Sequence, residues 1–129
     1  MKYDYIIVGA GSAGCVIANR LSEDPSNEVL LLEAGGSDRR FFIQMPIGYG
    51  VTYHQKAVNW MYMTEPSPDA DNKPSYWPRG KVMGGSSSIN AMVYVRGNPK
   101  DFDQWSEAGN PGWSYSDVLP YFKKMESWQ

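Results

Sequence analysis

The sequence predicts an α/β fold that opens with a parallel strand–helix–strand unit at residues 3–33. Residues 3–8 and 28–33 are short apolar runs of the kind that form buried strands. Between them, apolar residues recur at helical spacing over residues 13–23, and Pro25 ends that helix. Two strands joined in this way form a right-handed crossover of a parallel sheet.

The turn between the first strand and the helix has a glycine spacing that suits phosphate binding. Gly9, Gly11 and Gly14 form a Gly-x-Gly-x-x-Gly pattern directly after the strand. Gly9 allows the tight turn, Gly11 leaves room for a pyrophosphate beside the backbone, and Gly14 lets the helix lie close on the strand. Ser12 and Ala13 complete a helix N-terminus whose free N–H groups attract phosphate.

An acid at the end of the second strand adds the sugar-binding part of the pattern. Glu33 follows Gly14 at close to the spacing of about 20 residues at which a carboxylate binds ribose hydroxyls. Its charge repels a 2′-phosphate, so the Rossmann-like unit favours FAD or NAD over NADP. A glycine-rich turn without a ligand, with Glu33 as a surface charge, is the alternative interpretation.

Composition narrows the class of protein. The 129 residues are 42% hydrophobic and 20% charged, with a net charge of −2, which is typical of at most one globular domain. Lys and Arg pair only at 39–40 and 123–124, which argues against nucleic acid or an anionic membrane as a partner. The run Ile6–Ala10 is too short for a transmembrane segment or a signal peptide, so a cytoplasmic location is expected. No metal site is predicted. The only cysteine, Cys15, is interpreted as a small buried residue, with a reactive thiol as the alternative.

Residues 34 to about 80 form a long segment that Gly and Pro interrupt repeatedly. Only residues 60–64 suggest a short strand. The segment is rich in Tyr, Trp, Phe and Met, whereas disordered segments are poor in aromatic residues. We therefore expect an ordered arm that covers a cofactor.

A second glycine cluster lies in residues 79–98, here called the glycine–serine segment. Gly84 and Gly85 allow the backbone to approach a flat or charged ligand closely, and three serines follow them. Asn90 can donate and accept hydrogen bonds, as the edge of a heteroaromatic ring requires. Taken alone, the segment could equally be the capped start of a helix that binds nothing.

Residues 99–128 are predicted to be helical. Pro99 suits the first turn of a helix over 99–108. Ser114 and Asp117 have the spacing of a capping box for a second helix, which Pro120 should bend or split.

The whole chain resembles the N-terminal part of the glucose–methanol–choline (GMC) oxidoreductases, flavoenzymes that oxidise alcohols. The resemblance includes the glycine pattern, Leu32-Glu33-Ala34-Gly35, Asn59-Trp60, Thr64-Glu65-Pro66, the glycine–serine segment and Gly112-Trp113-Ser114-Tyr115. It is strongest to the branch that contains choline dehydrogenases and related alcohol dehydrogenases.

The resemblance implies that FAD is the cofactor. It places the pyrophosphate and ribose at Gly9, Gly11, Ser12, Ala13, Gly14, Glu33 and Ala34. It places the rest of FAD at Trp60, Arg79, Val82, Gly84, Gly85, Ser86, Asn90, Ala91, Met92 and Val93. Ile89 stands where covalently flavinylated relatives have a histidine, so noncovalent FAD is expected.

The catalytic part of the family pattern has no match, so no catalytic residue is assigned. In the family, a hydride passes from the alcohol carbon to flavin N5 while a C-terminal histidine takes the hydroxyl proton. The only histidine is His54, in the long arm, and it does not match that motif. We expect the base to come from a missing segment or a complementary C-terminal chain.

The sheet is also expected to be incomplete, because two strands leave exposed surface that further strands would bury, and the substrate domain has no counterpart. Residues 1–129 are therefore interpreted as the N-terminal portion of an FAD-binding domain. A noncatalytic FAD-binding remnant is the alternative. An NAD-binding unit would leave residues 80–98 without a role.

Overall fold

The computed structural model describes residues 2–126, which divide into two compact units at Met92 and Val93. The boundary falls inside the predicted glycine–serine segment. Each unit is described by itself. In the described part of the chain, no helix combines the length and the apolar character that crossing a bilayer requires.

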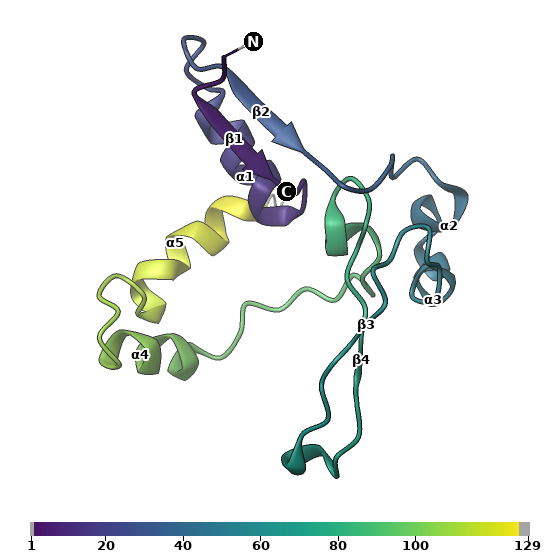
Figure 1. Ribbon diagram of the computed structural model, residues 1–129. Coiled ribbons are helices and arrows are strands. Elements are labelled where there is room, and N and C mark those ends of the chain that lie inside the picture. The colour runs from purple at the N-terminus through teal and green to yellow at the C-terminus, as the bar shows by residue number, and fades with distance from the viewer. Residues whose placement is uncertain (1, 127–129) are drawn as a thin grey trace. The chain divides into compact units, whose positions relative to one another are not determined.

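The first unit begins with the predicted strand–helix–strand arrangement (Figure 1). β1 (Tyr5–Val8) and β2 (Val29–Leu32) pair in parallel, with Tyr5 opposite Val29 and Val8 opposite Leu32. α1 (Ser12–Leu21) connects the strands and packs against both. The α/β fold class and the parallel crossover are therefore confirmed.

β1 is mostly exposed and β2 is partly buried, so the expectation of buried strands is wrong for this chain, whereas the exposed surface expected of an incomplete sheet is present. Ile6 is 59% exposed and Val8 is 84% exposed. Among residues 2–126 no third strand joins this sheet, and only α1 covers it. The exposure agrees with an incomplete sheet, because a parallel sheet normally has neighbours and helices on both faces.

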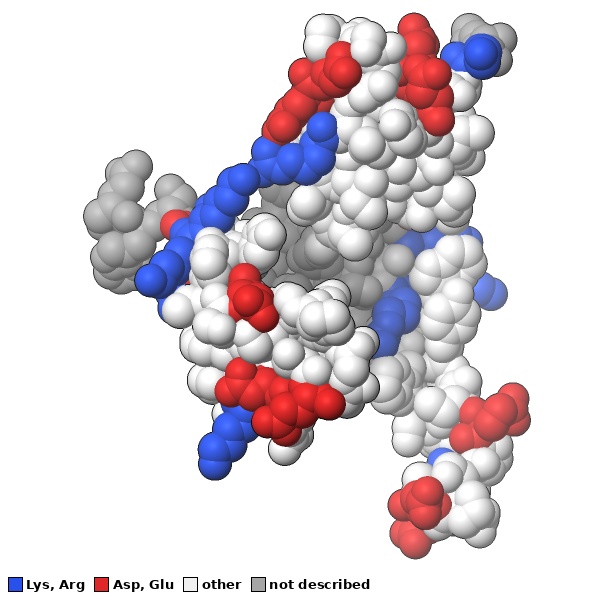
Figure 2. Space-filling view, turned by 90° about the vertical axis from the view of Figure 1, so that its left-hand side faces the viewer, with Lys and Arg blue, Asp and Glu red and all other residues white. Residues whose placement is uncertain are grey.

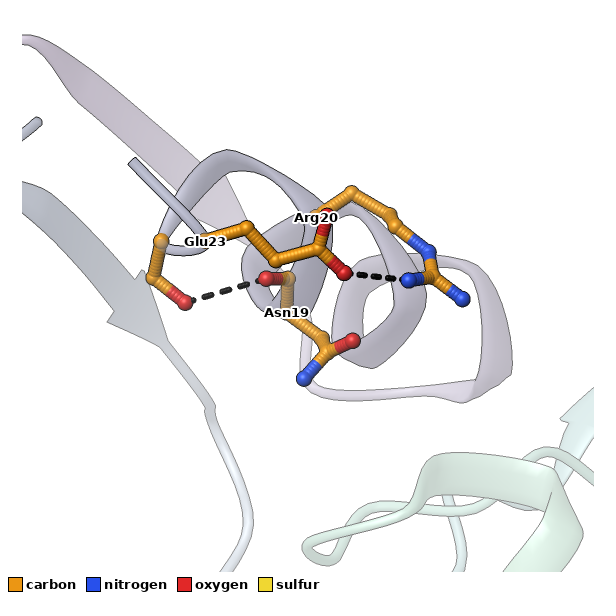
Figure 3. Close-up of polar contacts among 4 residues, drawn as sticks. Asn19, Arg20 and Glu23 are labelled. Carbon is orange, nitrogen blue, oxygen red and sulfur yellow. Dashed lines mark hydrogen bonds and ion pairs between the residues drawn. The ribbon is translucent and has the colours of Figure 1, made fainter. Parts of the chain in front are cut away.

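α1 ends at Leu21, two residues before its predicted end, in a local set of polar contacts (Figure 3). Arg20 forms an ion pair with Glu23, and the Ser22 hydroxyl donates to the Asn19 carbonyl at 3.1 Å. Asp24 then accepts bonds from the hydroxyl and the backbone N–H of Ser26. These bonds favour the charged carboxylate and lower the pKa of Asp24.

Cys15, in the first turn of α1, is exposed, so its interpretation as a buried residue is wrong.

The predicted arm is ordered and contains more structure than the single expected strand. It includes α2 (Phe41–Gln44), a 3₁₀ turn (Pro46–Gly48) and α3 (Tyr49–Thr52). β3 (Tyr62–Met63) pairs antiparallel with β4 (Tyr76–Trp77) in a long hairpin with a 3₁₀ turn at Pro68–Ala70. Acidic side chains gather at the far end of this hairpin, where the chain carries Glu65, Asp69 and Asp71 (Figure 2).

A small core holds the arm to the glycine–serine segment. Val58 and Val82 are fully buried, Ile89 is 5% exposed, and Ile43 packs against them. The segment then forms a 3₁₀ turn at Gly85–Ser88.

The second unit is a pair of helices, α4 (Pro99–Glu107) and α5 (Tyr115–Met125). Asn98 caps α4, and Ser114 and Asp117 form the predicted capping box of α5. Pro120 does not split α5. Proline removes only one backbone donor, and the capped first turn and the packing of Phe102 against Phe122 support the helix on either side of it.

Candidate functional site

A cavity of about 620 Å³ lies in the first unit at the carboxyl ends of β1 and β2. This volume is in the range of small-molecule and cofactor sites, about 300–1,000 Å³. In open parallel sheets, ligands bind outside the carboxyl ends of the strands. The cavity is lined by Val8, Gly9, Gly11, Leu32, Glu33, Ala34, Trp60, Tyr62, Arg79, Gly80, Gly85 and Ser86.

The glycine turn at one side of the cavity has the geometry that the sequence predicts. Gly9 has φ +97°, a left-handed conformation that favours glycine, and its N–H donates to the Leu32 carbonyl at 2.7 Å. A Cβ on Gly14 would lie 1.9 Å from the Gly9 carbonyl oxygen, so only glycine allows this contact between α1 and the strand end.

Gly11 differs from Gly14 because its hydrogen faces open space. A Cβ on Gly11 would meet no atom within 4 Å, and its φ is an ordinary −77°. The fold itself therefore does not require glycine here, but a ligand lying against the turn would. Among residues 2–126, the N–H groups of Ser12, Ala13 and Gly14 have no protein acceptor, so they are available to an anion.

Glu33 connects the end of β2 to the glycine turn. One carboxylate oxygen accepts from the Ala10 N–H and the other from the Gly35 N–H, both at 2.8 Å. Each oxygen has a second lone pair that can accept another donor. The carboxylate is thus held in a fixed orientation on the cavity wall while it keeps the capacity to bind two hydroxyl groups.

The glycine–serine segment joins this site through backbone contacts. Gly36 and Val82 form a parallel bridge, and the Met83 N–H donates to the Gly36 carbonyl at 2.9 Å. The Gly84 N–H donates to the Ala10 carbonyl at 2.8 Å. These bonds bring the second glycine cluster against the first.

The three serines have different roles in the structure. The hydroxyl of Ser87 donates to the Gly84 carbonyl and that of Ser88 to the Met83 carbonyl, both at 2.7 Å. The Ser86 oxygen accepts from the Gly80 N–H at 3.1 Å, and Ser86 lines the cavity. Ser87 and Ser88 therefore stabilise the turn and line a smaller neighbouring cavity, whereas Ser86 lines the cavity at the strand ends.

Aromatic and basic side chains from the hairpin form another wall of the cavity, the hairpin wall, which consists of Trp60, Tyr62 and Arg79. Trp60 and Tyr62 stack with ring centroids 5.9 Å apart, and the Lys81 ammonium lies 4.5 Å from the centre of the Trp60 ring. The Arg79 guanidinium lies 4.9 Å from the Trp77 ring. Such pairs present flat apolar surfaces next to positive charge, which suits an aromatic ligand with phosphates.

The structure brings together about half of the residues predicted for the cofactor. Gly9, Gly11, Glu33, Ala34, Trp60, Arg79, Gly85 and Ser86 line the cavity. Ser12, Ala13 and Gly14 form the adjacent start of α1. Asn90 and Ala91 line a neighbouring cavity of about 300 Å³, and Asn90 and Met92 line another of about 210 Å³.

Three predicted residues lie elsewhere. Val82 is fully buried in the core and lines none of the cavities described. Gly84 contacts Ala10 and is absent from the cavity lining. Val93 is 80% exposed and belongs to the second unit.

Four lining residues were missed by sequence reasoning: Val8, Leu32, Tyr62 and Gly80. Val8 and Leu32 could have been found, because they are the last residues of two parallel strands.

A parallel βαβ unit with this glycine turn, an acid after β2 and a cavity at the strand ends defines a dinucleotide-binding unit. A model of the GMC oxidoreductases matches residues 3–128, and the chain belongs to this family. The predicted family is thereby confirmed, and with it FAD as the cofactor of this N-terminal region.

The relatives agree with the predicted branch. The chain is 56% identical over 126 residues to proteins named oxygen-dependent choline dehydrogenase from Vibrio vulnificus and from Rhizobium etli. The match covers 98% of this chain but 22% and 23% of those relatives. The chain thus spans less than a quarter of their length.

Solved structures show the same arrangement. Pyridoxine 4-oxidase from Mesorbium loti is 40% identical, with a TM-score of 0.85 over 94% of this chain and 24% of its own. A formate oxidase is 36% identical, with a TM-score of 0.82 over 92% of this chain and 21% of its own. An FAD-dependent oxidoreductase from Chaetomium thermophilum is 38% identical, with a TM-score of 0.76 over 94% of this chain and 20% of its own.

Proposed function

We propose that this chain provides the FAD-binding N-terminal part of a flavoenzyme that oxidises an alcohol at its CH–OH carbon. The observation that carries the proposal is the meeting of two glycine clusters at one cavity. Gly11 and Gly85 both border it, and Glu33 lies on its wall. A dinucleotide needs this combination of backbone access for phosphates and a carboxylate for a ribose.

The residues present fit FAD. The space beside Gly11 is where a Cβ would project, and the N–H groups of Ser12, Ala13 and Gly14 can donate hydrogen bonds to the pyrophosphate oxygens. Glu33 would bind the ribose hydroxyls, and its bonds to Ala10 and Gly35 orient it for that role. Ala34 would contribute its backbone next to Glu33.

The remaining FAD contacts are assigned to the hairpin wall and the glycine–serine segment. Trp60 and Arg79 would pack on the dinucleotide from one side, and Gly85 and Ser86 from the other. Asn90, Ala91, Met92 and Val93 would contact the flavin end, with Gly84 and Val82 supporting them through the backbone. Ile89 is buried and has no nucleophile, which supports noncovalent binding.

The chemistry depends on the bound cofactor and on groups outside this chain. FAD, when bound, supplies the acceptor for the hydride that leaves the alcohol carbon. The only histidine, His54, stacks on Tyr76 and lines none of the cavities described. We therefore propose that the base that takes the hydroxyl proton comes from another segment or chain, and that the substrate is a small alcohol, with choline as the first candidate because of the named relatives.

A noncatalytic FAD-binding module is a second candidate function, because His54 lines none of the cavities described. NAD binding is a weaker alternative, since it would leave the contact of the glycine–serine segment with the cavity without a purpose.

The test is an equilibrium titration of the purified chain with FAD and, separately, with NAD. We expect FAD to bind and to show the two visible flavin bands in the bound fraction, while NAD binds more weakly. Under anaerobic conditions, choline should leave the flavin of the chain alone oxidised. Bleaching after addition of a complementary C-terminal segment supports the enzyme, and persistent colour supports the noncatalytic module. Failure to bind FAD contradicts both.

A further inference from the structure

Asn59 has all of its hydrogen-bonding capacity in use although it lies inside the arm. The residue is 1% exposed. Its side-chain NH₂ donates to the Tyr53 carbonyl at 2.8 Å and to the Tyr76 hydroxyl at 3.1 Å. Its side-chain oxygen accepts from the backbone N–H of Met61 at 2.9 Å and of Arg79 at 3.0 Å. One amide thus joins three separate stretches of chain.

Two of these stretches contain Trp60 and Arg79, which belong to the hairpin wall of the FAD cavity. Asn59 pairs antiparallel with Gly80, and the Trp60 N–H donates to the Arg79 carbonyl at 2.8 Å. Trp60 follows Asn59 directly in the chain, and Arg79 is bonded to the Asn59 oxygen through its N–H. Both Trp60 and Arg79 line the cavity, whereas Asn59 does not.

The hydrogen-bonding groups that contact the Asn59 side chain require an amide at this position. The Tyr53 carbonyl oxygen receives two donors, the Tyr76 hydroxyl at 2.6 Å and the Asn59 NH₂. A carboxylate in this place has no proton for that carbonyl and would set negative charge against it in a buried site. On its other side, the amide oxygen holds Met61, whose φ of +55° is unusual for a residue other than glycine.

We propose that Asn59 is a positioning residue for the cofactor, which fixes the places of Trp60 and Arg79 on the cavity wall without touching FAD. This inference rests on the proposed FAD site, and it adds a residue that acts on the site through the backbone. Removing the two amide donors should loosen residues 60–61 and 79–81, here called the hairpin base. The affinity for FAD should then fall, although the glycine turns and Glu33 stay unchanged.

The decisive variant is Asn59→Asp, because it keeps the shape and the accepting oxygen but has no donor when ionised. The matched control is Asn72→Asp, the same chemical change at an exposed position of the same hairpin. At pH 8 we expect Asn59→Asp to bind FAD about tenfold or more weakly than the control, as for a lost bond to a buried group. Far-UV circular dichroism checks that both variants fold.

The pH profile separates positioning from general damage. Burial should raise the pKa of the introduced carboxyl, and once protonated it has one O–H that can donate to the Tyr53 carbonyl. FAD affinity relative to the control should therefore recover as the pH falls from 8 to 5. The titratable residues of the packed segments are common to both variants, so the ratio at each pH removes their contribution; they are Tyr53, His54, Tyr76, Arg79 and Lys81.

Hydrogen exchange of the chain without FAD gives a second readout. The amides of residues 60–61 and 79–81 should exchange faster in Asn59→Asp at pH 8 than in Asn72→Asp. If the wild-type chain binds no FAD, the proposed function fails, while this comparison still decides whether Asn59 orders the hairpin base.

Equal FAD affinity of the two variants at pH 8, or a loss that does not recover in acid, overturns the proposal. If Asn59→Asp does not fold, Tyr76→Phe decides instead, because it removes the hydroxyl that shares the Tyr53 carbonyl with Asn59. A severalfold loss of FAD affinity supports the proposal, and unchanged affinity overturns it.

Discussion

Gly85 lies against Gly11 so closely that a Cβ on Gly85 would come 2.9 Å from the Gly11 Cα. Real Cβ atoms essentially never approach a neighbour to this distance, so the contact requires glycine at position 85. The two residues belong to different glycine clusters, one after β1 and one in the glycine–serine segment. Their contact builds a single backbone surface at the cavity from segments that are far apart in the sequence.

Gly85→Ala should therefore destabilise the chain and weaken FAD binding together. The left-handed φ of +58° costs about 1–2 kcal/mol for a residue other than glycine, and the contact with Gly11 adds to this. The control is Gly112→Ala, where φ is +85° but a Cβ would meet nothing within 4 Å. Denaturant unfolding should show a larger loss for Gly85→Ala than for Gly112→Ala, and equal losses would mean that the close contact is unimportant.

Gly11→Val should abolish or strongly reduce FAD binding without unfolding the chain. The new side chain enters the open space beside the turn, where the pyrophosphate is proposed to lie, and steric overlap of this kind costs about 1–3 kcal/mol or more. Gly50→Val is the matched control, since a Cβ there also meets nothing within 4 Å and Gly50 lines none of the cavities described. Titration with FAD should separate the two variants, and full flavin occupancy of Gly11→Val would place the pyrophosphate elsewhere.

Replacing Glu33 should weaken FAD through the ribose. Glu33→Ala removes both acceptors, and we expect a loss of about 1–3 kcal/mol, as for hydrogen bonds to a charged group. Glu33→Gln retains one accepting oxygen and replaces the other by an NH₂ that cannot accept from Ala10 or Gly35. Its dissociation constant should lie between those of the wild type and Glu33→Ala. An unchanged constant in both variants would contradict the ribose assignment.

The second unit should lose stability in acid through one ion pair. Arg96 binds Glu126 with two donors, one of them at 2.8 Å. The bonds from Arg96, and then from Tyr94, lower the pKa of Glu126 below its ordinary value of 4.5. Burial, followed by the bond to Glu126, raises the pKa of Tyr94.

Because the pKa of Glu126 is lowered in the folded state, its stabilisation is fully present above pH 4.5 and is lost as the pH falls below that value. Hydrogen exchange across α5 should therefore accelerate in acid relative to Glu126→Gln at the same pH. Parallel behaviour of the two proteins would exclude the pair as the cause.

The sequence predicted those elements whose determinants are local. The strand runs, the glycine spacing of Gly9, Gly11 and Gly14, and the capping box of Ser114 each lie within a few residues and fix their own geometry. Glu33 lies at the cavity because its spacing after the glycine turn is set by the length of one crossover.

The arm and the second half of the site were less predictable, because long-range contacts determine them. The Tyr76 hydroxyl donates to the Tyr53 carbonyl, and Val82 packs in the core with Val58 and Ile89. Val82 was assigned to the cofactor by its place in the family pattern, and the pattern does not show which way a side chain points. β1 is exposed because, within residues 2–126, β2 is the one strand that pairs with it.

Amide chemical shifts of the ¹⁵N-labelled chain during titration with FAD test the central claim most directly. If the pyrophosphate lies on the glycine turn, the largest changes should occur at the N–H groups of Ser12, Ala13 and Gly14, together with Gly85. Unchanged shifts at these amides in a chain saturated with FAD would contradict the account.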